Sequence, residues 1–276
     1  YFCAIQTPVH LDRSKFPCWG LAAQHSGVFS SLRLHLRRKF WRESVLPAIN
    51  RERELTHLNP INDLYGHFFH SGHQLIASDP AMVFVQSSPE RTVTGFWFFD
   101  TPEIDSDLQN YLNSGPPPVF IELHRISDEE IRNLCEHLNK DHHRVLIRSR
   151  REVTVPLPDS CRRLNQDASL RVLGSASVAV HEGSPRLVAA AARAGIPQVI
   201  QPDLEDQRFW AGAVSKKGLS PKPVLESTAE SILRAVHEAL NSAPITLKAK
   251  QIGEELRSDD GCARAVEAVE ALLKTA

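Results

Sequence analysis

The chain has 276 residues, of which 42% are hydrophobic and 24% charged, and its formal net charge is -1. This length suits two domains or one large one, and the composition is ordinary for a soluble globular protein. A charge so close to zero gives no reason to expect nucleic acid as a partner. The chain opens on Tyr1, without an initiator methionine or a signal-like segment, so we expect it to begin within a longer protein.

The five cysteines are scattered and show no CxxC spacing, which argues against a disulfide framework and against a zinc site. A reducing, cytoplasmic location is therefore expected, with neither a metal nor another cofactor. No apolar run approaches the roughly 20 residues that a membrane-spanning helix needs.

Residues 1–100 are rich in proline, histidine and aromatic residues and carry weak periodicity. Phe29 to Val45 predicts a basic amphipathic helix, with Leu32, Leu36 and Phe40 on its apolar face. Its charges are interpreted as a solvated face, and peripheral contact with a membrane surface is the alternative.

Three further elements are expected in this first region. Leu46 to Leu58 predicts a second, exposed helix, and two apolar runs, Met82 to Gln86 and Thr92 to Phe98, predict strands. We interpret residues 1–100 as the latter part of one domain.

Residues 101–118 have the composition of a linker, with a short helix near Leu108 to Leu112 and three prolines from Pro116. Consecutive prolines fit neither a helix interior nor a central strand, so a new domain is expected to start at Val119.

Residues 119–276 alternate apolar strands with amphipathic helices. The predicted strands are 119–123, 144–148, 178–181 and 198–201, and 153–167 is expected to be an irregular connection. Two of the predicted helices start at capping boxes, formed by Ser127 with Glu130 and by Ser227 with Glu230. The other predicted helical segments are Ser184 to Ala194, 209–217 and the region from Ile252 to Leu272. This alternation predicts an α/β fold with a doubly wound parallel sheet.

The unit from Val178 to Trp210 carries the candidate site. Ser184 and Pro185 predict the start of a helix directly after a buried strand, and Gly195 predicts its end. A parallel crossover directs such a helix N-terminus to the carboxyl edge of the sheet, where its amides and dipole favour a phosphate. Asp206 and Gln207 follow the next strand and offer groups suited to sugar hydroxyls.

Six ordered segments resemble the nucleotide-sugar glycosyltransferases of the GT-B fold, and most of all the sterol 3-beta-glucosyltransferases and the bacterial macrolide and glycopeptide glycosyltransferases. The segments lie at residues 93–100, 115–120, 180–183, 194–199, 206–210 and 259–267. The pair Asp206-Gln207 followed by Phe209-Trp210 is the most specific of them.

The resemblance implies two Rossmann-like domains: an incomplete N-terminal, acceptor-binding domain (1–100), a linker (101–118) and a complete C-terminal, donor-binding domain (119–276). It implies transfer of a sugar from a nucleoside diphosphate sugar, of the UDP or TDP type, to a hydroxyl of a lipophilic acceptor such as a sterol or a polyketide-like compound. The donor-binding residues that it implies are His181, Gly183, Ser184, Arg186, Asp206 and Gln207. No metal is implied, and the family's general base, a histidine, would precede Tyr1.

The candidate phosphate turn departs from the family. The family turn reads His-His-Gly-Gly-x-Gly-Thr, whereas this chain has His181-Glu182-Gly183-Ser184-Pro185-Arg186-Leu187. Glu182 puts a carboxylate beside the expected phosphate and should repel it unless it points away, while Arg186 is a suitable phosphate donor. Two interpretations stay open: an enzyme with a rebuilt phosphate site, or a GT-B homologue without catalysis that serves as a binding or partner protein.

Overall fold

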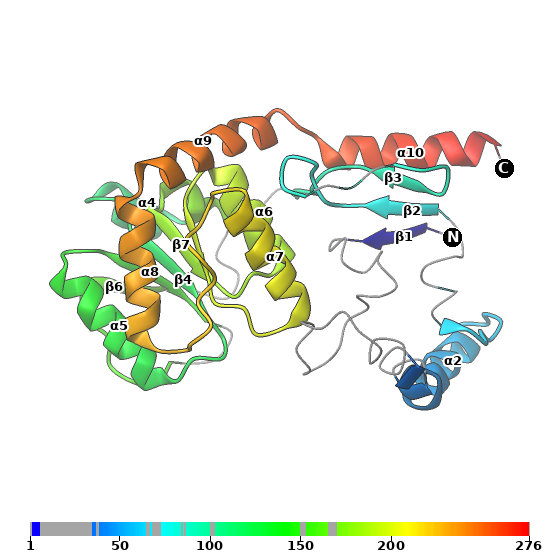
Figure 1. Cartoon of the computed structure of the whole chain (residues 1–276), viewed down its shortest axis with the longest axis horizontal. Helices are drawn as coiled ribbons and strands as arrows, with labels where there is room; N and C mark the ends of the chain where they lie inside the picture. The colour runs from blue at the N-terminus through cyan, green and yellow to red at the C-terminus, as the bar shows by residue number, and fades with distance from the viewer. Residues whose placement is uncertain are drawn as a thin grey trace.

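The computed structural model describes residues 2–5, 35–36, 39–64, 67, 73–83, 85, 87–99, 103–149, 153–164 and 170–275. Two parallel sheets organise these residues (Figure 1). The first has the order β1-β2-β3, with β1 at Phe2–Ile5, β2 at His73–Ile76 and β3 at Arg91–Val93. The second has the order β6-β5-β4-β7-β8, and all of its strands lie within residues 119–200.

The strand prediction for Met82 to Gln86 is wrong where the structure describes it. Met82 and Val83 belong to a turn instead, whose backbone amides both donate to the carbonyl of Asp79, and the two side chains are buried. Phe84 and Gln86 lie outside the described residues. The predicted strand from Thr92 ends early, because only Arg91–Val93 pairs with β2 and residues 94–99 are irregular.

Helical structure before the first sheet's second strand follows the prediction where it is described. Residues 35–36 and 39–40 are helical, and the π-helical segment η3 (Trp41–Val45) continues into α2 (Leu46–Leu55). Leu36 and Phe40 are 55% and 58% exposed. Leu32 and the beginning of the predicted helix lie outside the described residues.

The second sheet confirms the predicted parallel arrangement. Its strands are β4 (Val119–Glu122), β5 (Val145–Arg148), β6 (Cys161–Leu164), β7 (Val178–His181) and β8 (Gln198–Ile200), and every pair is parallel. The strand β6 corrects the expectation of an irregular connection at 153–167. Its sequence, Cys-Arg-Arg-Leu, has no apolar run because it pairs on one side only, at the sheet edge.

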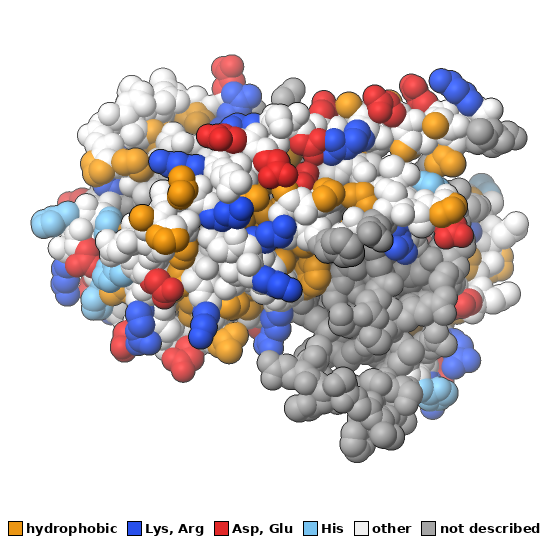
Figure 2. Space-filling view, turned by 45° about the horizontal axis from the view of Figure 1, so that its top comes forward, with side chains coloured by type: hydrophobic (Ala, Val, Ile, Leu, Met, Phe, Trp, Pro, Cys, Tyr) orange, Lys and Arg blue, Asp and Glu red, His pale blue; other side chains and the backbone are white. Residues whose placement is uncertain are grey.

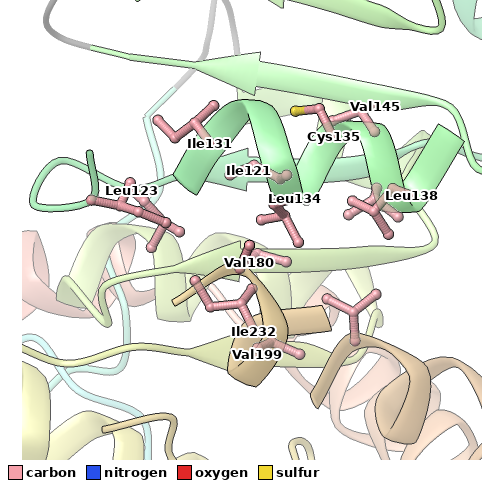
Figure 3. Close-up of a cluster of buried hydrophobic side chains, with 14 of the residues drawn as sticks. Ile121, Leu123, Ile131, Leu134, Cys135, Leu138, Val145, Val180, Val199 and Ile232 are labelled. Atoms are coloured by element: carbon pink, nitrogen blue, oxygen red, sulfur yellow. The ribbon is translucent and has the colours of Figure 1, made fainter. Parts of the chain in front are cut away.

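Helices cover both faces of the second sheet. On one face, α5 (Asp128–Lys140) and α8 (Ala229–Asn241) bury a cluster with Val119 and Ile121 of β4 (Figure 3). Phe120, which points to the opposite face, packs with α4 (Ser106–Asn113), the 3-10 helix η4 (Leu170–Ser175) and α6 (Pro185–Ala194). Alternate strand residues therefore serve two apolar layers, as a doubly wound sheet requires.

The starts of α5, α6 and α8 agree with the sequence to within a residue, but their caps differ. The helix predicted at 209–217 starts earlier, at Glu205, and the predicted helical region from Ile252 to Leu272 is two helices that start at Ala243 and Gly261. Ser127 accepts from the amide of Glu130 at 3.2 Å, whereas the Glu130 side chain accepts from the amide of Ala229 rather than completing a capping box. The residue that caps α8 is Thr228, not Ser227. Ser184 holds the N-cap position of α6 without a side-chain bond to the helix amides.

Three more helices come after β8 in the chain: α7 (Glu205–Lys216), α9 (Ala243–Arg257) and α10 (Gly261–Thr275). Trp210 of α7 is fully buried and its ring lies 5.7 Å from that of Phe96, which follows β3. α9 packs on α6, and α10 runs beside the first sheet (Figure 1). No helix among the described residues is long and apolar enough to cross a membrane.

Candidate functional site

The candidate site lies at the carboxyl edge of the second sheet, where the turns after β4, β7 and β8 meet. β4 and β7 are parallel neighbours, and their register pairs Glu122 with His181, the last residues of the two strands. The turns that follow these residues therefore leave the sheet side by side. Such an edge is where ligands bind in open parallel sheets.

His181 is completely buried beneath the turn, and both of its ring nitrogens are used within the protein. The amide of Gly183 donates to Nδ1 at 3.0 Å, so Nε2 carries the proton and donates to Oε1 of Gln198 at 3.0 Å. Burial lowers the pKa of His181 to about 4, and the nearby Arg186 acts in the same direction. His181 therefore positions the turn as a neutral imidazole.

Gly183 lets the turn approach α7 closely. Its φ is +90°, and a Cβ there would lie 2.9 Å from Cγ2 of Ile200 and 3.0 Å from the carbonyl oxygen of Gln207. A side chain would be strained by the backbone conformation and blocked by these atoms. The structure thus brings together two of the predicted donor-binding residues, Gly183 and Gln207.

Gln207 and Asp206 lie in the first turn of α7. The side-chain oxygen of Gln207 accepts from the amides of Asp203 and Leu204, at 2.8 and 2.9 Å, and fixes the start of the helix. Its side-chain amide nitrogen remains as the donor that could face a sugar hydroxyl. Asp206 is partly buried, and Leu204 rather than Asp206 holds the N-cap position.

Arg186, in the first turn of α6, is paired with a carboxylate that the sequence reasoning did not single out. Its guanidinium lies 3.1 Å from Oε1 of Glu122, and Arg148 lies 2.6 Å from the other oxygen of the same carboxylate. Glu122 is only 3% exposed, and His124 approaches it at 3.6 Å. The available signal was a charged residue ending each of two neighbouring apolar strands, Val-Phe-Ile-Glu and Val-Leu-Ile-Arg.

Glu182 is bound by the turn after β4. Its Oε1 accepts from the amides of His124 and Arg125, at 2.6 and 3.1 Å, and the residue is 9% exposed. Arg125 in turn pairs with Asp203 at 2.9 Å, which connects this turn to the segment before α7. The two turns are therefore joined through a carboxylate.

Among the described residues at this edge, acidic and basic side chains occur in equal number. Glu122 pairs with Arg148 and Arg186, Asp203 pairs with Arg125, and Glu182 accepts from two backbone amides. Acidic and basic side chains are also mixed over the face drawn in Figure 2. Within the described part of the chain, no group of three or more His, Cys, Asp or Glu side chains is placed to hold a metal ion.

Two polar atoms at the same edge are buried without a hydrogen-bond partner in the described structure. They are the acceptor Oε1 of Gln201, directly after β8, and Nδ1 of His124. A buried polar atom without a partner costs free energy, and such groups are commonly satisfied by a ligand or by water. Chemically, the edge thus offers guanidinium donors, an amide donor and two unsatisfied polar atoms to a polar ligand.

A model of the family described as erythromycin biosynthesis protein CIII-like, C-terminal domain, matches residues 133–272, about half of the chain. A vancomycin aglycone glucosyltransferase from Amycolatopsis orientalis is 27% identical over 200 residues, which cover 68% of this chain and 49% of that protein. An O-mycaminosyltylonolide 6-deoxyallosyltransferase from Streptomyces fradiae is 29% identical over 193 residues, covering 66% and 45%.

Solved structures share the arrangement of the elements. The glycosyltransferase VinC in complex with dTDP superposes with a TM-score of 0.60 at 17% identity, covering 87% of this chain and 63% of that one. The chain spans about half the length of the curated relatives that it matches.

Proposed function

Because the chain belongs to the erythromycin biosynthesis protein CIII-like C-terminal domain family and has the GT-B α/β fold, we propose that it transfers a sugar from a nucleoside diphosphate sugar to a hydroxyl of a lipophilic acceptor. The donor is of the UDP or TDP type, and the acceptor is a sterol or a polyketide-like compound. The observation that carries the proposal is the contact of the Gly183 turn with α7, which gathers the candidate donor-binding residues at one edge.

The donor half of the proposal assigns different roles to the candidate residues. Arg186, at the mouth of α6 and 43% exposed, is the cation nearest to where a diphosphate would lie. Asp206 and the amide nitrogen of Gln207 are the groups for sugar hydroxyls. Ser184 offers a hydroxyl that does not cap its own helix. His181 holds the turn in place from below, because both of its ring nitrogens bond within the protein.

The acceptor half rests on apolar surface at the junction between the two sheets. Phe99 is 77% exposed at the end of the segment that follows β3. Phe98 stacks under Arg193 of α6, whose guanidinium carbon lies 4.3 Å from the ring centre. Phe98 and Phe99 would offer aromatic contacts to an apolar acceptor at this junction. We place the protein in the cytoplasm, where nucleotide sugars and reduced cysteines coexist.

A second candidate function is that of a GT-B homologue that binds a partner without catalysis. The observation in its favour is the balanced charge at the carboxyl edge, because Glu122 pairs with the very arginine, Arg186, that a diphosphate would need. Paired charges attract an anionic ligand less strongly than surplus positive charge would.

Two experiments distinguish the two functions. The first is titration calorimetry with UDP, dTDP and their glucose conjugates, and the second is a transfer assay with sterol and macrolide acceptors. We expect saturable nucleotide binding and product formation, and Asp206→Ala should lower transfer at least about tenfold, the effect of losing about 1.4 kcal/mol of binding. Asp159→Ala, which removes an exposed carboxylate from the turn before β6, is the matched control and should change neither. Absence of nucleotide binding by the wild-type protein would leave the second candidate.

A further inference from the structure

The turn between β4 and α5 forms an anion-binding position, and the protein itself supplies the anion. Consecutive amides at His124 and Arg125 both donate to one oxygen of Glu182. Adjacent backbone amides at the end of a parallel strand are the arrangement that holds phosphate oxygens in nucleotide-binding proteins. Glu182 as a residue is 9% exposed, so its side chain is buried between the two turns.

The surroundings of Glu182 are those expected around a bound phosphate. The carboxylate lies between the turn after β4 and the turn after β7, whose parent strands are direct neighbours in the sheet. Arg125 is 69% exposed and Arg186 is 43% exposed, so both guanidinium groups can reorient toward solvent. An entering anion would therefore meet the two amides once the carboxylate had left, and each arginine would have to exchange its present partner, Asp203 or Glu122, for the anion.

We propose that the Glu182 carboxylate is an internal occupant of the anion position between these two turns, and that a diphosphate binds there only by displacing it. This proposal concerns the donor site of the proposed function and rests on it. A carboxylate and a phosphate cannot share the same amides, because both are negative and each needs the same two donors. Glu182 thus sets the affinity of the site and holds it closed until a donor arrives.

Pyrophosphate is the probe for this competition, since it has the two linked phosphoryl groups of the donor without its sugar or base. We expect Glu182→Ala to bind pyrophosphate about tenfold tighter than the wild-type protein or better, because the amides lose their internal acceptor. Glu182→Gln keeps an oxygen for both amides but removes the charge, so its affinity should fall between the two. Glu238→Ala, which removes an exposed carboxylate from α8, should bind like the wild type.

The thermal unfolding midpoint of each variant checks that the variant is folded. If Glu182→Ala does not fold, the comparison of pyrophosphate affinities is made between Glu182→Gln and the wild type. Equal pyrophosphate affinity for the wild type and the two Glu182 variants, or no binding by any of them, would overturn the proposal and reduce Glu182 to a structural link. Wild-type sugar transfer with unchanged pyrophosphate affinity in the variants would reject this inference alone. Tighter binding in the variants without sugar transfer by any protein would reject the proposed function alone.

Discussion

Buried carboxylates occur in two regions of this molecule and are compensated in opposite ways. At the carboxyl edge of the second sheet, Glu122 faces two guanidinium groups and Glu182 faces two amides. At the junction between the sheets, Asp79, after β2, faces another carboxylate, Asp259, which is itself bound by Arg264 of α10. We call these regions the edge cluster and the junction cluster.

The electrostatic consequences of the two arrangements differ. In the junction cluster, burial first and the neighbouring Asp259 second raise the pKa of Asp79 to about 6, while Arg264 lowers the pKa of Asp259. Arg264 also donates from Nε to the carbonyl of Thr94 at 2.7 Å, which fastens α10 to the segment after β3. Glu122 and Glu182 are met by hydrogen-bond donors, whereas burial beside a second acid raises the pKa of Asp79, so the neighbours of a buried acid and not its burial alone distinguish the two clusters.

The largest effect is expected from breaking the edge cluster at its centre. Glu122→Ala leaves Arg148, 18% exposed, and Arg186 without their shared carboxylate, and should lower the free energy of unfolding by about 3 to 5 kcal/mol. Urea denaturation measures this loss. The control is Glu230→Ala, since Glu230 is 85% exposed beside Arg234 and its removal should cost no more than about 0.5 kcal/mol. Similar losses for the two variants would mean that the buried pairing contributes little.

Acid should weaken the edge through His181. Its folded-state pKa, about 4, lies below the ordinary value of 6.5, so the unfolded chain binds the proton first. The resulting stability is complete above pH 6.5 and is lost as the pH falls through 4, by about 3 kcal/mol in total. Unfolding measured from pH 7 to 4 should show this slope, and His181→Gln should flatten it. His137→Gln, at an exposed position of α5, should leave it unchanged, and an equal slope in all three proteins would contradict the assignment.

The close approach of the turn to α7 can be tested by adding one methyl group. Gly183→Ala introduces a Cβ at φ +90° against Ile200 and the carbonyl of Gln207 and should destabilise the protein by about 2 to 3 kcal/mol. Gly212→Ala is the matched control, because a Cβ there meets nothing within 4 Å in the middle of α7. It should stabilise by up to about 1 kcal/mol. Thermal midpoints of the two variants that shift in the same direction would count against the packing described here.

The junction cluster should respond to pH with the opposite sign. The folded-state pKa of Asp79, about 6, is above its ordinary 3.8, so the stability it contributes is complete below pH 3.8 and is lost as the pH rises through 6. Asp79→Asn keeps an oxygen for the amide of Ala81 and should be more stable than the wild type by about 1 to 2 kcal/mol at pH 8. Asp260→Asn, a neutralisation at an exposed cap in the same region, should change little. An Asp79→Asn variant less stable than the wild type at pH 8 would contradict the raised pKa of Asp79.

Much of the second sheet follows from local sequence. Strands β4, β5, β7 and β8 are apolar runs, and glycine ends α6 in the left-handed conformation at Gly195. β6 escaped prediction because an edge strand needs fewer apolar residues, and the run at Met82 misled because its side chains are buried by a turn packed against α7 and α9. The domain boundaries at 100 and 118 stay predictions.

The meeting of the turn after β7 with the start of α7 was predicted from the sequence, but the side-chain contacts within it could not be foreseen. The turn after β7 and the start of α7 meet as predicted, since both follow neighbouring parallel strands. The partners of the predicted residues come from other strands: Gln198 for His181 and Glu122 for Arg186. These pairs depend on sheet order and register, which no local pattern encodes. Whether the six predicted residues bind a donor stays a prediction.

The central claim, that a nucleoside diphosphate binds between the turns after β4 and β7, is tested most directly by titrating dTDP or UDP into the ¹⁵N-labelled protein and following the backbone amide signals. We predict that the signals of His124, Arg125 and Gly183 shift and saturate together, because the ligand replaces Glu182 as the acceptor of the two amides in the turn after β4. Signals that saturate elsewhere while those of His124 and Arg125 stay in place, or no shifts at all, would contradict the account.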